Sequence, residues 1–307
     1  MISILMATYN GEQYIEQQLE SLLSQTIQEF VLYVCDDHST DGTYNILLRY
    51  AKQYQDKIHV SQNSQNSGSS KENFFELMLH NQDDYIMLCD QDDVWLPNKI
   101  EMSFSAIQNR EVVAGKQTPI LLHTDLCVVD KDLHVVNPSL NQMLDLNLEY
   151  DTLAAQIVQN TVTGGTVMYN RALAKLIKKP SFCIMHDWWI GLIATAFGEK
   201  IYLPEATMLY RQHDQNVIGA KNVRSLGYTI NRVLHIRDIR TLLDATYQQA
   251  SAFLREYNIH LNDKQVEFLQ KYVSIPTVSK FKRWQRINEL RTVKHGFFRR
   301  VAQLLYI

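Results

Sequence analysis

The 307-residue sequence predicts an α/β fold with a mixed, mostly parallel sheet, followed by a helical C-terminal region. Short apolar runs alternate with helical patterns in the first half, which is typical of βαβ units. Each of these runs ends in a polar cluster, and helical periodicity replaces the runs after about residue 217. We therefore expect one domain over residues 1–217 and a helical region over residues 218–307.

Apolar, β-rich runs and amphipathic patterns take turns along the first hundred residues. The expected strands are Ile2–Ala7, Phe30–Cys35, Ile58–Ser61 and Tyr85–Cys89. The expected helices are Glu12–Gln25, a segment after Gly42 that carries Tyr44, Leu47, Leu48 and Ala51, the segment Glu72–His80, and a helix with Pro97 in its first turn. Strands of such a sheet are covered on both faces by the intervening helices.

The middle of the chain is mixed. Further strands are expected at Ile120–Val129, Leu133–Val136, Thr166–Tyr169, Lys200–Leu203 and Met208–Arg211, with a turn at Lys131-Asp132 and a helix at His186–Phe197. In open α/β sheets the ligand lies beyond the carboxyl ends of the strands. The polar clusters that follow the strands are therefore the first place to look for a binding site.

Charge is unevenly distributed along the chain. The net charge is -3, but residues 280–307 hold eight Lys or Arg and one Glu, a balance of +7 that leaves -10 for residues 1–279. Aromatic side chains interleave with these basic residues, namely Phe281, Trp284, Phe297, Phe298 and Tyr306. A basic amphipathic tail of this kind favours peripheral membrane contact; a solvated helix or a homodimer contact is the alternative. The acidic body argues against nucleic acid.

Compartment signals are weak but consistent. The four cysteines show no CxxC spacing, and no stretch approaches the roughly 20 apolar residues of a membrane span. The N-terminus has no basic region followed by a cleavage site. We expect a cytoplasmic protein with reduced cysteines that sits peripherally at the inner face of the cell membrane.

The segment Asp90-Gln91-Asp92-Asp93 directly follows an apolar run. Three carboxylates within four residues repel one another unless a cation lies between them. Mg²⁺ or Mn²⁺ typically takes one or two carboxylates and completes its shell with water and substrate phosphates. A metal site is one interpretation, and a solvated loop with a helix N-cap at Asp93 is the other.

The pair Asp36-Asp37 closes the second expected strand. A carboxylate there could accept hydrogen bonds from a nucleotide base or a ribose. The alternative is a turn and helix N-cap through Ser39 and Asp41-Gly42.

With these residues in hand, the first 216 residues resemble inverting glycosyltransferases of family 2, which have the GT-A fold. Five motifs occur in the family's order: Ala7–Gly11, Asp36–Thr43, the loop with Asn66, Gly68, Lys71 and Asn73, the acidic segment Asp90–Asp93, and His186-Asp187. The resemblance implies a nucleotide-sugar site with Thr8, Tyr9, Asn10, Asp36, Asp37, Asn66, Lys71, Asn73, Asp90 and Gln91 in donor binding. It also implies Mn²⁺ or Mg²⁺ held by Asp90, Asp92 and Asp93.

Finer features are similar to bacterial rhamnosyltransferases that build rhamnose-rich cell-wall polysaccharides on a lipid carrier. These features are the Asp90–Asp93 segment, the run His186–Trp189, and the stretch from Tyr210 to Asn216. They imply dTDP-β-L-rhamnose as donor and a lipid-linked saccharide as acceptor. A different hexose from a UDP-sugar, in capsule or exopolysaccharide synthesis, is the alternative. His186 departs from the commoner Glu, which puts its role in doubt.

The family's chemistry assigns further roles. Asp187, at the start of a helix, is the expected general base for the acceptor hydroxyl, and an ordinary helix N-cap is the alternative. His186, Trp188 and Trp189 would contact the acceptor, although the tryptophans could equally be core residues. Gly164 and Gly165 permit close backbone approach to the acceptor, or simply form a turn. His213 would complete the metal shell, and Arg211 would contact the diphosphate.

Two rival functions remain open. A nucleotidyltransferase also has a parallel sheet and a metal-binding Asp, but Ala7–Gly11 lacks the glycine-rich signature with a basic residue expected there. The other rival is an inactive carbohydrate-binding scaffold. The complete set of Asp90, Asp92 and Asp187 argues against it.

Overall fold

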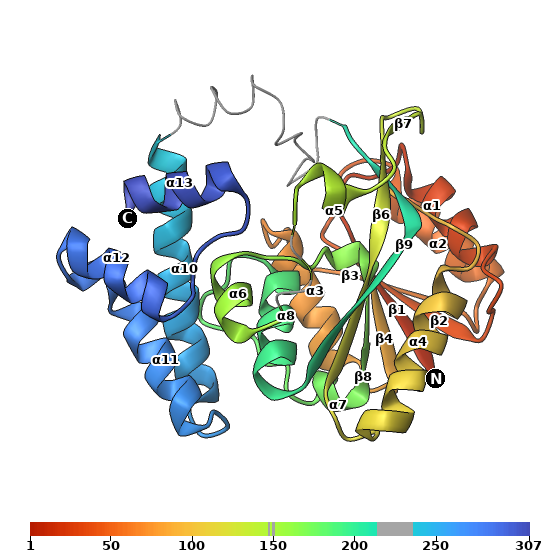
Figure 1. The fold of residues 1–307 in the computed structure, drawn as a ribbon. Helices are drawn as coiled ribbons and strands as arrows, with labels where there is room; N and C mark the ends of the chain where they lie inside the picture. The colour runs from red at the N-terminus through yellow and green to blue at the C-terminus, as the bar shows by residue number, and fades with distance from the viewer. Residues whose placement is uncertain (147, 149–150, 214–235) are drawn as a thin grey trace. The chain divides into compact units, whose positions relative to one another are not determined.

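The computed structural model describes residues 1–146, 148, 151–213 and 236–307 (Figure 1). The chain forms two compact units. The first contains Met1–Leu140, Val162–Ile177 and Gly198–Ala220, and the second contains Asn141–Thr161, Lys178–Phe197 and Lys221–Ile307. The predicted domain boundary at residues 217 and 218 lies outside the described residues and stays a prediction.

A nine-stranded sheet forms the centre of the first unit, in the order β3-β2-β1-β4-β8-β6-β9-β5, with β7 beside β6. The strands are β1 Ile2–Thr8, β2 Phe30–Asp36, β3 Ile58–Gln62, β4 Tyr85–Asp90, β5 Val94–Trp95, β6 Ile120–Val129, β7 Val135–Asn137, β8 Val167–Asn170 and β9 Glu199–Arg211. The long pairings β1–β2, β1–β4, β2–β3 and β6–β9 are parallel. The shorter pairings of β4, β6, β5 and β7 with their other neighbours are antiparallel. This confirms the predicted α/β class with its mixed, mostly parallel sheet.

Helices lie on both sides of this sheet (Figure 1). They are α1 Ile15–Leu23, α2 Thr43–Gln53, α3 Ser70–His80, α4 Lys99–Ala114 and the short α7 Arg171–Ala174. Helix α3 packs on β1 and β2, and α4 packs on β6 and β8. The strand residues between them, such as Leu5, Leu32 and Leu88, are almost fully buried. Burial on both faces explains why these strands read as continuous apolar runs.

Two local predictions need correction. Pro97 does not lie in the first turn of α4, which begins at Lys99 with Asn98 as N-cap. The backbone before the helix is instead tied to its neighbours, because Leu96 donates to Thr207 O and Pro97 O accepts from Thr26 N. The two strands expected at Lys200–Leu203 and Met208–Arg211 are one strand, β9, whose register with β6 shifts near Thr124 and Asp125.

The second unit is helical, as predicted for the C-terminal region. Its helices are α6 Leu153–Val158, α8 His186–Phe197, α10 Ile236–Tyr257, α11 Asp263–Val273, α12 Lys280–Glu289 and α13 Phe297–Tyr306, and the short α5 Leu140–Met143 begins at the last residue of the first unit's first segment. Its core is aromatic: Trp189 contacts Phe253 edge-on, with ring centroids 5.3 Å apart, and Tyr257 packs on both. A capping box at Asn262 and Gln265 starts α11. No helix in the described ranges is long and apolar enough to cross a membrane.

Candidate nucleotide-sugar site

Polar residues converge at the carboxyl ends of β1, β2 and β4. In the parallel register Thr8 stands opposite Asp36, and Ala7 stands opposite Asp90. Because parallel strands end at one edge of a sheet, this register gathers the first, second and fourth sequence motifs in one place. The binding role predicted for these strand-end clusters stays a prediction.

Asp36 organises this edge from a fully buried position. One carboxylate oxygen accepts from the hydroxyls of Thr8 (3.0 Å) and Ser39 (2.6 Å). The other accepts from Ser39 N and Gln62 Nε2, both at 2.9 Å. Four donors match what a buried carboxylate needs, so Asp36 fixes the loop after β2. Its predicted contact with the nucleotide stays a prediction.

Asp37 links the loops that follow β2 and β3. Its carboxylate accepts from Asn63 Nδ2 (2.7 Å) and from the backbone N–H (2.9 Å) and hydroxyl (2.8 Å) of Ser67. Asn66 donates to Asp37 O and accepts from Gly68 N, whose φ of +76° needs glycine. The loop that contains Asn66 and Gly68 is therefore shaped around Asp37.

The third motif ends in helix α3. Asn73 is buried and donates to Cys35 O at 2.7 Å, which ties α3 to the end of β2. Its other amide atom, Oδ1, is buried and has no hydrogen-bond partner in the part of the chain that the structure describes. Lys71 lies in the first turn of α3 and is half-buried. The donor roles of both residues stay predictions.

The loops after β1 and β4 are joined by a side chain. The Gln91 amide accepts from Tyr9 N at 2.8 Å and donates to Tyr9 O at 2.9 Å, so it pairs with the backbone as a neighbouring strand would. A Cβ atom on Gly11 would come within 2.4–2.8 Å of this amide. Asn10 adopts φ of +49°, and its Oδ1 accepts from Thr40 N, which connects the same loop to the one after β2. Tyr9 itself is exposed.

Asp90 is approached closely by the backbone of the paired glycines. Gly164 and Gly165 are buried in a 3₁₀ turn, and a Cβ on Gly165 would lie 3.3 Å from Asp90 Oδ2 and 3.2 Å from Met208 Cε. Gly165 therefore leaves room for the Asp90 carboxylate. The predicted acceptor contact of these glycines stays a prediction.

Asp92 and His213 meet across 121 positions of sequence. Asp92 Oδ2 and His213 Nε2 are 2.8 Å apart, and both side chains are mostly buried. The His213 ring stacks on Tyr14, with centroids 4.8 Å apart. The structure thus brings together two of the four residues predicted to bind metal.

Asp93 is fully buried. Its Oδ1 accepts from Arg211 N at 3.1 Å, and its Oδ2 has no hydrogen-bond partner among the described residues. Burial raises the pKa of Asp93 well above its usual value, and the charges of Asp92 and Asp90 raise it further. Lys99 is also fully buried, and burial lowers its pKa to about 7. Its Nζ donates to Thr207 Oγ1 at 3.1 Å and lies 4.7 Å from the centre of the Trp95 ring.

The Arg211 guanidinium bonds to other groups of the protein. Its guanidinium donates to Asp92 O (2.9 Å), Lys131 O (2.7 Å) and Gln17 Oε1 (2.5 Å), and it covers the Tyr14 ring at 4.7 Å. The side chain is buried. These bonds hold the metal loop against β9 and α1. The predicted contact with the diphosphate stays a prediction.

A divalent cation fits the acidic segment. The charges of Asp90 and Asp92 raise the pKa of Asp93, and the buried Asp93 Oδ2 lacks a donor among the described residues. A cation would offset both the repulsion and the missing partner, and carboxylate oxygen with imidazole suits Mn²⁺.

A different trio, Asp130, Asp132 and His134, has its ligand atoms within 4.8 Å of one another. These residues form the turn between β6 and β7. Asp130 Oδ1 accepts from the backbone N–H of Asp132 and His134 at 2.9 Å each, and Oδ2 lies 3.2 Å from His134 Nδ1. The cluster is accounted for by the turn that it closes.

In the second unit, Asp187 lies in the first turn of α8, as predicted. It is half-buried, and Oδ1 accepts from Asn160 Nδ2 at 3.1 Å and from Trp188 N at 2.6 Å. His186 beside it is buried, and burial lowers its pKa to about 3, which keeps the imidazole neutral. Asn160 thus orients the Asp187 carboxylate, and the residue remains partly exposed.

The two tryptophans are buried in the same unit. Trp188 Nε1 donates to Gln156 O at 2.5 Å. Trp189 is enclosed by Phe253 and Tyr257, so it is a core residue, which is the alternative that the sequence left open. A sugar could reach Trp189 only if these rings moved apart.

Comparison with known proteins agrees with this arrangement. The model of the family "Glycosyl transferase family 2" matches residues 3–177, more than half of the chain. The chain belongs to glycosyl transferase family 2.

Relatives within the family include the dTDP-rhamnosyl transferase RfbG of Shigella flexneri, 28% identical over 230 residues that cover 70% of this chain and 74% of the relative. The putative teichuronic acid biosynthesis glycosyltransferase TuaG of Bacillus subtilis is 28% identical over 222 residues, with 70% and 82% covered.

Solved structures show the GT-A fold. S. aureus TarS 1-349 in complex with UDP-GlcNAc matches with a TM-score of 0.57 and 18% identity, over 99% of this chain and 88% of that one. The mannosyltransferase PcManGT from Pyrobaculum calidifontis, in complex with GDP-Man and Mn²⁺, matches with a TM-score of 0.54 and 14% identity, over 99% and 86%.

Several site residues of this family 2 chain were not predicted. Tyr14 and Gln17 support His213 and Arg211, and Asn160 orients Asp187. Their signal in sequence is weak, since Tyr14 and Gln17 fit an ordinary helix pattern. Ser67 could have been predicted, because it lies between Asn66 and Gly68 of the third motif.

Proposed function

We propose that this family 2 glycosyltransferase moves L-rhamnose from dTDP-β-L-rhamnose to a hydroxyl of a lipid-linked saccharide in cell-surface polysaccharide synthesis. The observation that carries the donor site is the convergence of Thr8, Asp36 and Asp90 at one sheet edge, beside the Asp92–His213 contact. Rhamnose is supported by the similarity to the dTDP-rhamnosyl transferase RfbG, and polysaccharide synthesis by the similarity to TuaG.

Asp90, Asp92, Asp93 and His213 would hold Mn²⁺ or Mg²⁺. When bound, the ion supplies charge neutralisation for the diphosphate leaving group. The protein's own contribution is to hold these side chains in place. Arg211 fixes the loop through Asp92 O, Tyr14 supports the His213 ring, and Gly165 leaves space for Asp90.

Asp187 is the proposed general base of a single displacement with inversion. The acceptor oxygen bonds to the anomeric carbon as the bond from that carbon to the nucleotide diphosphate breaks, and the hydroxyl proton passes to the Asp187 carboxylate. The N-terminal end of α8 favours the ionised carboxylate. The Asn160 amide donates to Oδ1 and so orients the carboxylate.

Thermal shift tests the donor site directly. We expect dTDP to raise the melting temperature only with Mn²⁺ or Mg²⁺ present. A response to UDP in place of dTDP would favour the alternative, a UDP-hexose donor. Stabilisation by neither nucleotide would contradict the transferase proposal and favour an inactive carbohydrate-binding scaffold.

Asp187→Asn tests the base. We expect loss of transfer to a synthetic lipid-linked acceptor, with nucleotide stabilisation unchanged. Asp263→Asn, the same change in the first turn of α11, is the control and should keep activity. Loss of nucleotide binding in Asp187→Asn would make the residue structural. Donor identity follows from a screen of nucleotide sugars, with the product linkage read by NMR.

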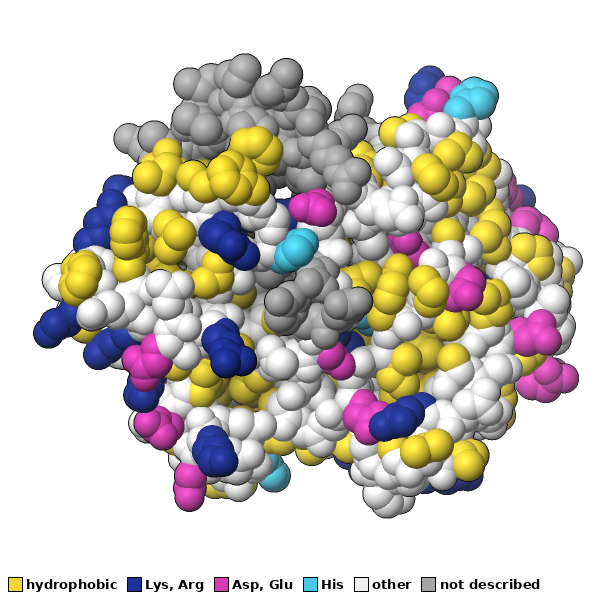
Figure 2. All heavy atoms as spheres, in the orientation of Figure 1, with side chains coloured by type: hydrophobic (Ala, Val, Ile, Leu, Met, Phe, Trp, Pro, Cys, Tyr) yellow, Lys and Arg dark blue, Asp and Glu magenta, His cyan; other side chains and the backbone are white. Residues whose placement is uncertain are grey.

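Peripheral membrane contact is proposed for residues 280–307. Phe281 and Phe297 are 71% and 73% exposed, and hydrophobic and basic side chains lie together over α12 and α13 (Figure 2). Such a surface suits the interface of an anionic bilayer. It would place the enzyme at the inner face of the membrane that holds a lipid-linked acceptor.

Substitution tests the membrane contact better than deletion, because Ile287 and Gln303 of the tail are buried. Phe281→Ser with Phe297→Ser should reduce pelleting with anionic vesicles. Ile259→Ser, at an equally exposed site (84%) outside the tail, should not. Equal pelleting of all variants would contradict the membrane contact and leave a solvated helix or a homodimer contact as the alternatives.

A further inference from the structure

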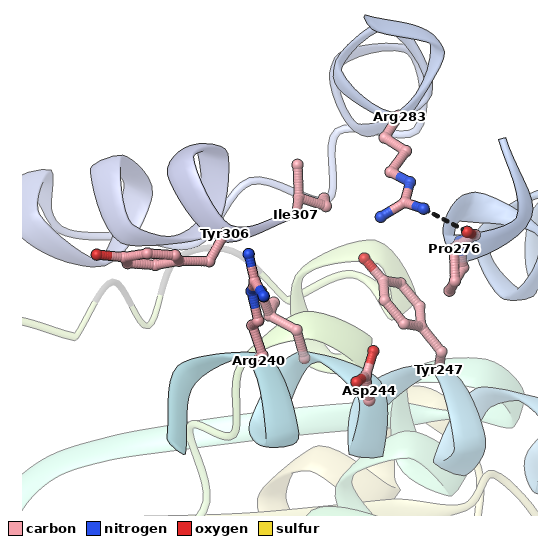
Figure 3. A pocket seen from close by; sticks show the side chains of 8 residues that line it. Arg240, Asp244, Tyr247, Pro276, Arg283, Tyr306 and Ile307 are labelled. Atoms are coloured by element: carbon pink, nitrogen blue, oxygen red, sulfur yellow. Dashed lines mark hydrogen bonds between the residues drawn. The ribbon is translucent and has the colours of Figure 1, made fainter. Parts of the chain in front are cut away.

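The helical unit contains a cavity of about 300 Å³ that is separate from every residue discussed for sugar transfer. Among the described residues its lining comes from α10, from the 3₁₀ turn Ile275–Thr277, and from α12 and α13. Figure 3 shows Arg240 and Tyr247 rising from α10 toward Arg283 of α12 and the end of α13.

Arg283 is held in place at the cavity wall. Its Nε donates to Val278 O at 2.8 Å, and its Nη2 donates to Pro276 O at 2.6 Å. The remaining nitrogen, Nη1, donates to no residue in the described part of the chain and faces the cavity in Figure 3. The backbone therefore fixes a guanidinium with one edge left for a ligand.

Arg240 and Tyr247 add donors of their own. Arg240 makes no hydrogen bond or ion pair with the residues that the structure describes. Tyr247 is only 8% exposed, yet its hydroxyl points into the cavity and bonds to no described residue. Burial raises the pKa of Tyr247, so the hydroxyl remains a donor. The hydroxyl therefore opens on the cavity, where it can donate to a ligand.

The ligand chemistry follows from these groups. Among the side chains at the cavity, two guanidinium groups and a phenol offer donors and positive charge, against the one carboxylate of Asp244. Arginine forks match phosphate oxygens best. A phosphate or diphosphate group is the acceptor that fits.

The surroundings indicate an amphiphile. Trp284 on α12 and Leu305 on α13 are exposed, together with Phe281. The two helices are tied by Trp284 Nε1 donating to Leu304 O (2.9 Å) and Lys280 Nζ donating to Leu305 O (3.0 Å). The two helices that line the cavity therefore also carry exposed apolar side chains.

We propose that this cavity binds the phosphate or diphosphate headgroup of an amphiphile whose hydrocarbon lies along α12 and α13. Two sources share this chemistry, an isoprenoid diphosphate carrier and an anionic phospholipid. As a site for the carrier of the acceptor, the inference rests on the proposed function; as a phospholipid site it does not.

Calorimetric titration of the full chain in EDTA tests the site without metal-dependent donor binding. The probes are farnesyl diphosphate and dihexanoyl phosphatidylglycerol, each below its micellar concentration. We expect Arg240→Gln to weaken binding about tenfold or more, and Tyr247→Phe about three- to tenfold, as for one lost bond to an anion. Lys282→Gln, an exposed change on α12 outside the cavity, should bind as the parent does.

The two probes identify the source, and tight binding of either supports the site. Absence of binding for both probes, or parental affinity in both Arg240→Gln and Tyr247→Phe, would overturn the proposal. Metal-dependent stabilisation by dTDP, measured on the same variants, should be unchanged. If dTDP with metal does not stabilise the unsubstituted protein, the donor site is refuted and the anion site still stands.

Discussion

Replacement of Arg211 by lysine keeps the charge and removes the planar fork. From a buried position, the guanidinium bonds to Asp92 O, Lys131 O and Gln17 Oε1 among its described partners. A lysine ammonium can take the place of one of them but cannot span all three. Each bond from a charged donor contributes about 1.5–3 kcal/mol, so two lost bonds predict a loss of about 2–4 kcal/mol after partial rehydration.

Thermal unfolding of the ligand-free protein measures this loss. A destabilisation of about 2–4 kcal/mol should lower the melting temperature by about 5–10 °C. Arg110→Lys is the matched control, because Arg110 binds the half-exposed Glu199 at the surface and the same exchange should cost under about 1 kcal/mol. If Arg211→Lys melts like Arg110→Lys but loses nucleotide binding, Arg211 serves the diphosphate and not the loop.

Three further predictions concern the same sheet edge. Asp92→Asn should abolish metal-dependent stabilisation by dTDP, while Asp130→Asn in the exposed turn should leave it intact, both by thermal shift. Gly165→Ala should weaken that stabilisation without unfolding the protein, because its methyl group would lie 3.3 Å from Asp90 Oδ2; unchanged nucleotide affinity would contradict the close approach. Lys99 has a pKa of about 7 when folded and about 10.4 when unfolded, so the unfolded state binds more protons between these values and stability rises with pH. Relative to Lys99→Met, the parent should gain about 3 kcal/mol from pH 7 to pH 10 in urea unfolding, and a parallel pH dependence would refute the burial of the charge.

The sheet could be predicted because its strands are buried on both faces. Ile120–Val129 has the same bounds in the prediction and in the structure, since Pro119 precedes the run and Asp130 follows it. The C-terminal helices could be predicted because their apolar residues recur at helical spacing. The grouping of 141–161 and 178–197 with those helices had no local signal, because it depends on contacts between distant segments.

The site was predictable as a set of positions but not as a set of contacts. Loop hydrogen bonds decide which carboxylates are already satisfied, and Asp36 with its four donors could not be told from Asp90 by sequence. The sequence around Lys99 carries no signal that this side chain is buried, and only the packing shows it. The sequence likewise carries no sign that Arg211 bonds to Asp92 O, Lys131 O and Gln17 Oε1.

The pairing of Gln91 with Tyr9 has a consequence for how this enzyme tolerates change. The amide occupies the space that a side chain at position 11 would need. Positions 11 and 91 should therefore be genetically coupled: in a library selected for transfer, larger residues at 11 would survive only with smaller ones at 91. Such variants would lose the strap between the two loops, so their defect would be in metal-dependent donor affinity although residue 11 carries no metal ligand.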